Sequence, residues 1–160
     1  MVDTVAGLSA LGITFSYSVE TTAGTKPTAF KLLHRINSID EITVTPEAID
    51  ASALEDLQTR NIAGRDTVTD TVAVTVNKTE ATIKEWKDLI TEYKALTDGK
   101  RMWFQEITPG ISDAEFFVAQ PPSKLPITGK EQNSLLTMAI NLIIEDMVGT
   151  DTAVTPTSGE

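Results

Sequence analysis

Three runs of alternating apolar and polar residues constrain the fold of this chain more than any other feature. In residues 13–19, 67–77 and 136–144, apolar side chains occupy nearly every second position. Successive side chains of a β-strand point to opposite faces of a sheet, so this period of two predicts strands with one buried face. The middle run is rich in β-branched residues, which favour strands further. Asp70 falls in the valine register of that run, so its first part is expected to leave the core.

Shorter apolar runs add to the strand content. Residues 30–36, 100–107 and 114–119 are extended, partly apolar segments, and turn-forming glycines and prolines separate them. The expected fold is therefore mainly β (α+β), an antiparallel β-sandwich or barrel.

One segment shows the period of an amphipathic helix, and we expect it over residues 79–97. Asn77 followed by Glu80 fits an N-cap, a start at Thr79 fits nearly as well, and Gly99 fits a helix stop. The stripe predicted to pack on the flank of the sheet contains Ile83, Trp86, Ile90 and Tyr93.

Composition narrows the possible classes of protein. A chain of 160 residues is most simply one domain, which we place at residues 12–148, between an N-terminal arm (1–11) and a flexible C-terminal tail (149–160). The absence of cysteine excludes disulfides and thiol catalysis. With no signal peptide and no membrane span, a soluble protein made in the cytoplasm is expected. A formal charge of −10 argues against a surface that grips nucleic acid.

A stretch between two predicted strands, residues 36–65, is too long for an ordinary hairpin connection. We expect a long loop, and the helix formers within residues 46–60 favour a short helix there. From Asp40 to Asp56 this stretch contains several acidic residues and no lysine or arginine. Such a charge pattern is typical of a solvated loop or of a contact with basic residues on a neighbouring subunit. Its apolar residues need a surface to cover them, either the chain's own core or another copy of the chain.

The same region carries a resemblance to a known family. Thr45-Pro46-Glu47-Ala48-Ile49-Asp50-Ala51-Ser52-Ala53-Leu54, then Asn61-Ile62-Ala63-Gly64-Arg65-Asp66 and an alternating strand, resembles tail tube proteins (major tail proteins) of phages with long non-contractile tails. The similarity covers roughly residues 30–147. It departs from the family pattern at Ser38-Ile39-Asp40-Glu41-Ile42, where many relatives have a glycine-containing turn.

The resemblance implies a structural virion protein whose hexameric rings stack into the hollow phage tail tube. DNA would pass through without specific binding, and further partners would be tape measure, tail terminator and baseplate or tail tip proteins, with no membrane. The protein would be made in the cytoplasm of a bacterial host. Asp66 and Asp70 are expected to face the lumen. The residues expected at subunit or ring interfaces are Ile39, Ile42, Pro46, Glu47, Ile49, Leu54, Ile62 and Gly64.

Other readings of the sequence remain open. A tube protein of a contractile tail or related secretion machine shares the fold, and a small monomeric β-barrel binding module could use Trp103 and Phe117 for stacking. An enzyme is not expected, and neither is a metal or cofactor. His34 has no second histidine or cysteine with which to bind zinc. The acidic pairs Asp113/Glu115 and Asp40/Glu41 are commoner as surface acids than as catalytic groups.

Overall fold

The computed structural model describes residues 7–158. Their elements follow the order β1 (Thr14–Val19), β2 (Lys31–Leu33), β3 (Ile36–Ile39), β4 (Val44–Asp50), β5 (Asn61–Val68), β6 (Thr71–Asn77), α1 (Glu80–Lys94), β7 (Met102–Ile107), β8 (Asp113–Gln120), β9 (Thr137–Thr152) and β10 (Thr157–Ser158). The expected class, mainly β with one flanking helix, is confirmed within this range.

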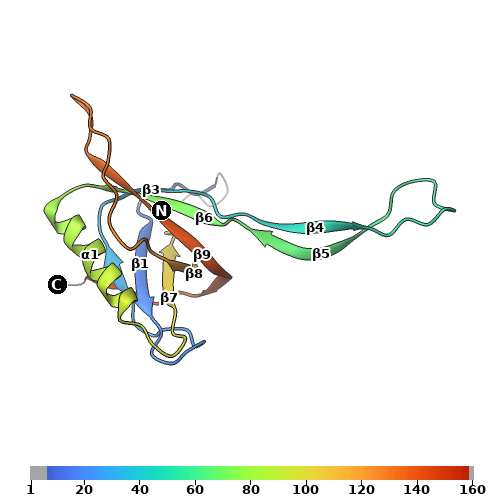
Figure 1. Cartoon of the computed structure of the whole chain (residues 1–160), viewed down its shortest axis with the longest axis horizontal. Helices are drawn as coiled ribbons and strands as arrows, with labels where there is room; N and C mark the ends of the chain where they lie inside the picture. Colours follow the sequence, from blue (N-terminus) through green and yellow to red (C-terminus); the bar gives the residue numbers. More distant parts are fainter. Residues whose placement is uncertain (1–6, 159–160) are drawn as a thin grey trace.

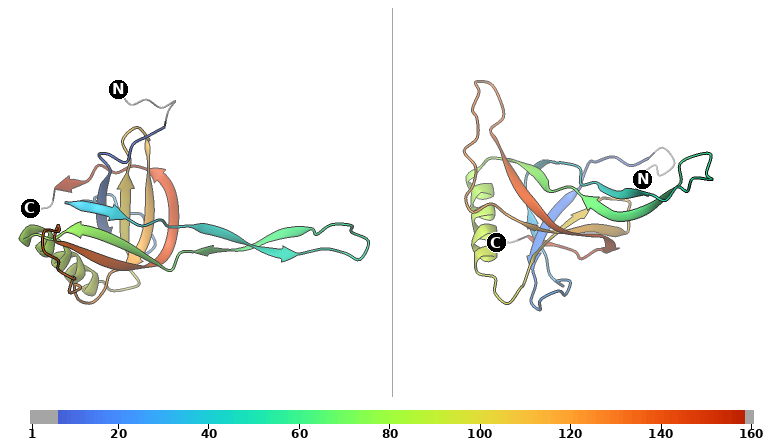
Figure 2. Two further views of the ribbon diagram at one scale, coloured as in Figure 1. Left: turned by 90° about the horizontal axis from the view of Figure 1, so that it is seen from above. Right: turned by 45° about the vertical axis from the view of Figure 1, so that its right-hand side comes forward.

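One eight-stranded sheet forms the body, in the order β10-β2-β1-β7-β8-β9-β6-β3. The sheet curls into a half-barrel, and α1 covers its concave side (Figures 1 and 2). Neighbouring strands are antiparallel except for the β10–β2 pair. The other two strands, β4 and β5, form a separate two-stranded sheet.

The curl of the sheet follows from strand β9. Its first half pairs with β6 and its second half pairs with β8, so a single strand turns the corner between them. Register shifts opposite Phe116/Phe117 and Val118/Ala119 insert extra residues, and Gly149 has φ +94°. Bulges of this kind bend a strand and increase its twist. The predicted strand over residues 136–144 therefore continues to Thr152.

The concave side of the sheet holds the main core. Phe15, Phe104 and Phe117 stack on neighbouring strands, with ring centroids 5.3 to 6.1 Å apart. From α1, Trp86 is fully buried and Ile90 is 7% exposed, while Ile83 and Tyr93 are partly buried against the same cluster. Burial of this apolar stripe, rather than helix propensity, holds α1 to the sheet.

A second, smaller core lies on the opposite face of β7 and β8. Alternation along these strands sends Trp103, Phe116 and Val118 to this face, where Phe30 packs with them. The C-terminal segment covers the cluster through Ala153 and Val154. The side chain of Gln105 clamps Val154 by donating to its carbonyl oxygen and accepting from its N–H, both at 2.8 Å.

The predicted tail over residues 149–160 is therefore wrong for residues 149–158. These residues complete β9, cover the second core and add β10 beside β2. The threonines and glycine that suggested mobility lie on a strand that pairs with β8, which comes much earlier in the chain. Of the predicted N-terminal arm, residues 7–11 have no regular structure and are exposed, and residues 1–6 lie outside the described residues.

The predicted long loop over residues 36–65 is also wrong, since β3, β4 and most of β5 fall in it. The short helix expected within residues 46–60 does not form. Pairing of the flanking β-branched residues, such as Ile49 opposite Ile62, outweighs the helix propensity of the alanines and leucines between them.

Two boundaries differ from the expected ones for local reasons. Arg35 has φ +59°, which breaks the expected extended segment 30–36 into β2 and β3. The helix starts after Thr79, whose hydroxyl accepts from the Thr82 N–H while the Thr82 hydroxyl accepts from the Thr79 N–H, a reciprocal capping box. It ends at Lys94 with Ala95 as C-cap, so it is shorter than 79–97, and Gly99 lies in the following turn.

Candidate functional site

The most unusual feature of the structure is a β-hairpin that projects away from the body, formed by residues 44–68 and here called the arm (Figure 1). Every residue of β4 is exposed, and β5 is exposed except for partial burial at Gly64 and Val68. The arm is joined to the body at its root, where the Thr69 N–H donates to the Thr43 carbonyl oxygen. An isolated two-stranded hairpin is marginally stable in water, so this length of exposed hairpin indicates a surface that is covered elsewhere.

Side-chain hydrogen bonds shape the tip of the arm. The Ser52 N–H donates to Asp50 Oδ1 at 2.9 Å, and the Ala53 N–H donates to Asp56 Oδ2 at 2.8 Å. Arg60 donates from its backbone N–H to the Ser52 hydroxyl and from Nε to Asp56 Oδ1, both at 2.8 Å. Such Asx-type bonds stabilise turns. The tip therefore has a defined shape although its side chains contact little else.

The hydrogen bonds at the tip also lower the pKa of two of its carboxyl groups. Bonds from the hydroxyl and then the backbone N–H of Ser52 lower the pKa of Asp50. The backbone N–H of Ala53 and then Arg60 lower the pKa of Asp56. Over the whole arm five carboxylates face two arginines, a formal charge of −3.

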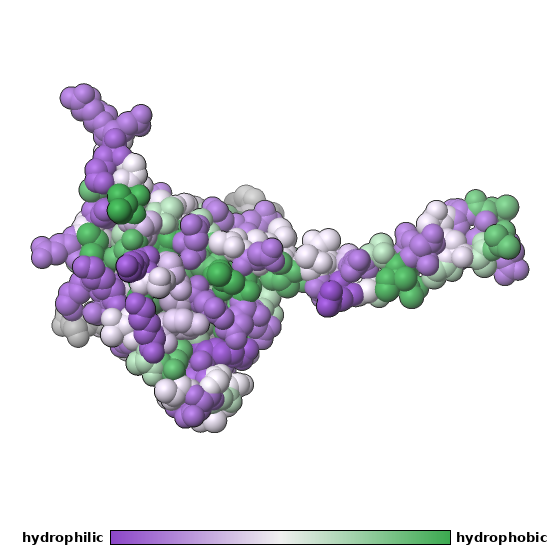
Figure 3. Space-filling view, viewed as in Figure 1, coloured by the Kyte–Doolittle hydropathy of each residue, from purple (hydrophilic) through white to green (hydrophobic). Residues whose placement is uncertain are grey.

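Apolar side chains gather at the tip and halfway along the arm (Figure 3). At the tip, Leu54 and Leu57 are as exposed as in an extended chain, with relative exposures of 108% and 103%. Halfway along, Ile49 pairs with Ile62, and they remain 49% and 57% exposed. Burying a leucine or isoleucine contributes about 1.5–3 kcal/mol, so these positions favour a protein contact.

The residues predicted for the interface divide into two groups. Ile39 and Ile42 pack partly against the main core, so their burial needs no second copy. Pro46, Glu47, Ile49, Leu54, Ile62 and Gly64 all lie on the arm. Leu57 was not among the predicted site residues, although it repeats the signal of Leu54, an apolar residue between acidic and polar ones.

The structure does not bring the two expected lumen acids onto one element. Asp66 is exposed on β5, opposite Pro46, and so belongs to the arm. Asp70 is exposed at the junction of β5 and β6, where its carbonyl oxygen accepts from the Ile144 N–H. The single strand expected over residues 67–77 is broken at this junction.

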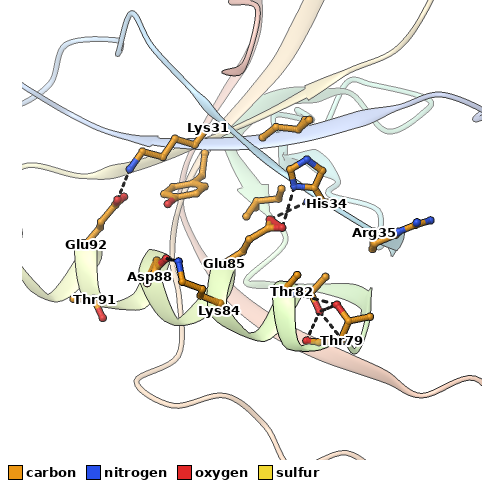
Figure 4. A pocket seen from close by; sticks show the side chains of 14 residues that line it. Lys31, His34, Arg35, Thr79, Thr82, Lys84, Glu85, Asp88, Thr91 and Glu92 are labelled. Carbon is orange, nitrogen blue, oxygen red and sulfur yellow. Dashed lines mark hydrogen bonds and ion pairs between the residues drawn. The ribbon is translucent and has the colours of Figure 1, made fainter. Parts of the chain in front are cut away.

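A groove of about 870 Å³ separates β2 from α1, and several charged pairs line it (Figure 4). His34 lies on it, with Nδ1 2.9 Å from Glu85 Oε1 and its backbone N–H donating to Glu85 Oε2. Lys31 pairs with Glu92. Burial and then the Glu92 carboxylate raise the pKa of Tyr17. These pairs tie the helix to the edge of the sheet.

A smaller pocket of about 240 Å³ lies among the acids Asp40, Glu41, Glu106 and Glu115. Glu106 and Glu115 are cross-strand partners on β7 and β8. Burial and then repulsion from Glu115 raise the pKa of Glu106. Asp113 does not line this pocket, so the Asp113/Glu115 pair considered from the sequence does not share it. Within residues 7–158, no group of three or more His, Cys, Asp or Glu side chains could hold a metal ion.

The aromatic platform considered for a binding module does not exist on the surface. Trp103 is 5% exposed and Phe117 is 3% exposed, and they belong to different cores on opposite faces of the sheet. Trp103 Nε1 donates to the buried carboxylate of Glu20 at 2.9 Å. In the part of the chain that the structure covers, no helix is long and apolar enough to cross a membrane.

Comparisons with known proteins find similarity among solved structures. No protein-family model matches the sequence, and no curated protein matches it. Among solved structures, the chain is similar to one in the cryo-EM structure of the anti-feeding prophage (AFP) baseplate, 6-fold symmetrised. The TM-score is 0.49 at 10% sequence identity, over 84% of this chain and 89% of that chain. At this similarity no step of the functional argument rests on the likeness.

Proposed function

We propose that this protein is a structural virion protein that self-assembles into stacked hexameric rings and so forms the hollow tail tube of a phage. The observation that carries the proposal is the arm, a projecting hairpin with exposed Leu54 and Leu57 at its tip and no body surface of its own to cover them. The resemblance of residues 45–66 to tail tube proteins falls on this same hairpin.

The body of the molecule suits a wall built from many copies. Among residues 7–158, no strand pairs with the outer edge of β3, and Thr157–Ser158 of β10 pair with the edge of β2. Open edges can pair with strands of another chain. In a ring, a contact between different surfaces of identical subunits closes by rotation and leaves two faces for stacking.

The two faces of the sheet suggest the orientation of each subunit. Helix α1 covers the concave face and would point outward from the tube. On β6 and β9, the opposite face exposes Thr71, Ala139 and Asn141 together with the apolar Ile143, and would contribute to the channel wall. Asp66 and Asp70 would add negative charge, so that DNA slides through without binding. Catalysis has no part in this proposal.

Negative-stain electron microscopy of the purified protein over a concentration series tests the proposal. Hollow tubes or six-fold rings are the expected result. A monomer at every concentration, also after mixing with tape measure and tail terminator proteins of the same phage, would contradict it. Copurification of a sheath protein would assign the same tube to a contractile tail.

A further inference from the structure

A second projecting segment lies far from the arm. Residues 121–136, here called the β8–β9 loop, connect β8 to β9 and rise from the body beside α1 (Figures 1 and 2). The arm leaves the opposite end of the molecule along its longest axis (Figure 1). Two surfaces at opposite ends of a chain cannot meet within one molecule, but they can meet head to tail between two copies.

The β8–β9 loop has an anchored base and an apolar surface. At its base Leu125 packs against the main core, Lys94 Nζ donates to the Ser123 carbonyl oxygen at 3.0 Å, and the Lys78 N–H donates to the Leu136 carbonyl oxygen. Ile127 is 95% exposed, and Leu135 is 66% exposed. The loop thus presents apolar side chains from a fixed position, as the arm presents Leu54 and Leu57.

The charges of the two segments are of opposite sign. The β8–β9 loop carries Lys124 and Lys130 against Glu131, a formal charge of +1, and both lysines are exposed. Lys78 and Lys94 add two further cations at its base. The tip of the arm carries Asp50, Glu55 and Asp56 against Arg60, a formal charge of −2. Opposite potentials favour this pairing over contact between two arm tips.

The length of the arm permits the contact. From Val44 to the tip the hairpin extends on the order of 35 Å at about 3.3 Å per residue. A body of this size has a diameter of about 35 Å. The tip of one arm can therefore reach across a neighbouring body to a loop on its far side.

We propose that the tip of the arm of one copy binds the β8–β9 loop of a second copy, with Leu54 and Leu57 against Ile127 and Leu135 and the acids of the tip beside Lys124 and Lys130. The inference rests on the proposed function for its assembly and adds which surface receives the arm. Because donor and acceptor surfaces differ, each copy can give one contact and receive one, which produces a ring or a stack.

Cross-linking tests the contact directly, because the natural chain contains no cysteine. Mixing the Leu54→Cys variant with the Ile127→Cys variant, and adding a short bismaleimide, should yield a covalent dimer of one chain of each. The control mixture combines Leu54→Cys with Ala23→Cys, because Ala23 is exposed on the 21–25 loop. We expect the first mixture to yield at least tenfold more covalent dimer than this control. Equal yields from the two mixtures, or dimers of Leu54→Cys alone in excess, would overturn the inference.

A charge exchange supplies an independent test. Lys124→Glu should raise the concentration needed for assembly at least tenfold. Adding Glu55→Lys, at the tip of the arm, to the same chain should restore assembly. Adding Asp113→Lys instead restores the same net charge at an exposed position of β8 and should not rescue. Equal rescue by both added lysines would show a net-charge effect and contradict the contact.

The two proposals fail in different ways. If tubes or rings form but the Leu54→Cys and Ile127→Cys mixture gives no excess of covalent dimer, the structural role stands. The β8–β9 loop is then not the surface that receives the arm. A chain that stays monomeric with its phage partners would overturn both.

Discussion

The side chain of Ile49 lies across Gly64 on the paired strand of the arm. A Cβ atom at position 64 would stand 3.0 Å from Ile49 Cδ1 and 3.2 Å from the carbonyl oxygen of Glu47. Such distances are too short for an undisturbed contact, so glycine at this position allows Ile49 to lie flat on the hairpin. The flat apolar face at the middle of the arm depends on this pair.

Gly64→Val should therefore lift Ile49 off the arm and weaken assembly without unfolding the body. We expect the free energy of unfolding of the body to change by no more than about 0.5 kcal/mol, because the arm around position 64 is largely exposed and projects away from the body. Sedimentation velocity would measure assembly, and urea titration would measure stability. Ala63→Val adds bulk to the opposite face of the same strand as a control. Normal assembly of Gly64→Val would show that the Ile49 face is not an interface.

Removing Trp86 should release the helix from the sheet. Its side chain is fully buried between α1 and the sheet. We therefore expect Trp86→Ala to lower the free energy of unfolding by about 3–5 kcal/mol. Thr91→Ala, on the exposed side of the same helix, should change stability by less than about 1 kcal/mol. Urea unfolding followed by circular dichroism measures both. Similar losses for the two variants would mean that helix propensity, and not packing, holds α1.

Gln105 should be the residue that holds the C-terminal segment in place. Gln105→Met keeps the approximate volume but removes the bonds to Val154 and to the Ser16 hydroxyl, and we expect a loss of about 2 kcal/mol. Hydrogen exchange should accelerate at Val154 and Thr157 more than at β1 or β7. Gln120→Met, whose bond to Glu145 is exposed, is the control. Uniform acceleration over the whole sheet would contradict a local clamp.

Glu20 should make the stability of the body dependent on acid pH. Burial raises the pKa of this carboxyl, but hydrogen bonds from Trp103, the Gly24 backbone and Arg101 together lower it below its usual 4.5. Because the folded-state pKa lies below the unfolded one, the stabilisation is present above the unfolded pKa and is lost as pH falls through the folded pKa.

Glu20→Gln should remove that acid-dependent part. We expect it to cost on the order of 3 kcal/mol at neutral pH, because the half-buried Arg101 guanidinium loses the buried carboxylate that it pairs with. We also expect it to flatten the fall in stability below pH 4.5. Asp151→Asn removes an exposed carboxyl whose pKa is also lowered and serves as the control. Urea titrations between pH 3 and pH 7 measure both variants. An unchanged pH profile in Glu20→Gln would assign the acid sensitivity to other groups.

The strand pattern of the body could be predicted from the sequence because it depends on local alternation. Phe15 and Tyr17, or Met138 and Ile140, fall on one face wherever the strand lies in the sheet. The helix was predictable for the same reason. Its end was not, because Leu96 continues the apolar stripe beyond the point where the backbone leaves the helix.

The arm and the C-terminal segment could not be predicted in the same way. Leu54 and Ile39 look alike in sequence, yet Leu54 is exposed at the tip while Ile39 packs on the main core, and only the tertiary structure separates them. Val154 follows a threonine-rich stretch, and its position depends on Gln105, which lies 49 residues away in the chain. Register and long-range pairing decide both cases.

Charged residues on the apolar surface of the arm should separate folding from assembly. Ile49→Asp with Leu54→Asp should abolish rings and tubes while leaving a folded monomer, because burying either carboxylate in a contact is costly and neither side chain supports the body. Electron microscopy and size-exclusion chromatography would measure assembly, and circular dichroism would check the fold. Thr21→Asp with Ala23→Asp adds the same charge to an exposed loop of the body and should still assemble. Intact tubes from the arm variant would remove the arm from the interface, and the open β3 edge would then become the main candidate for contact between subunits.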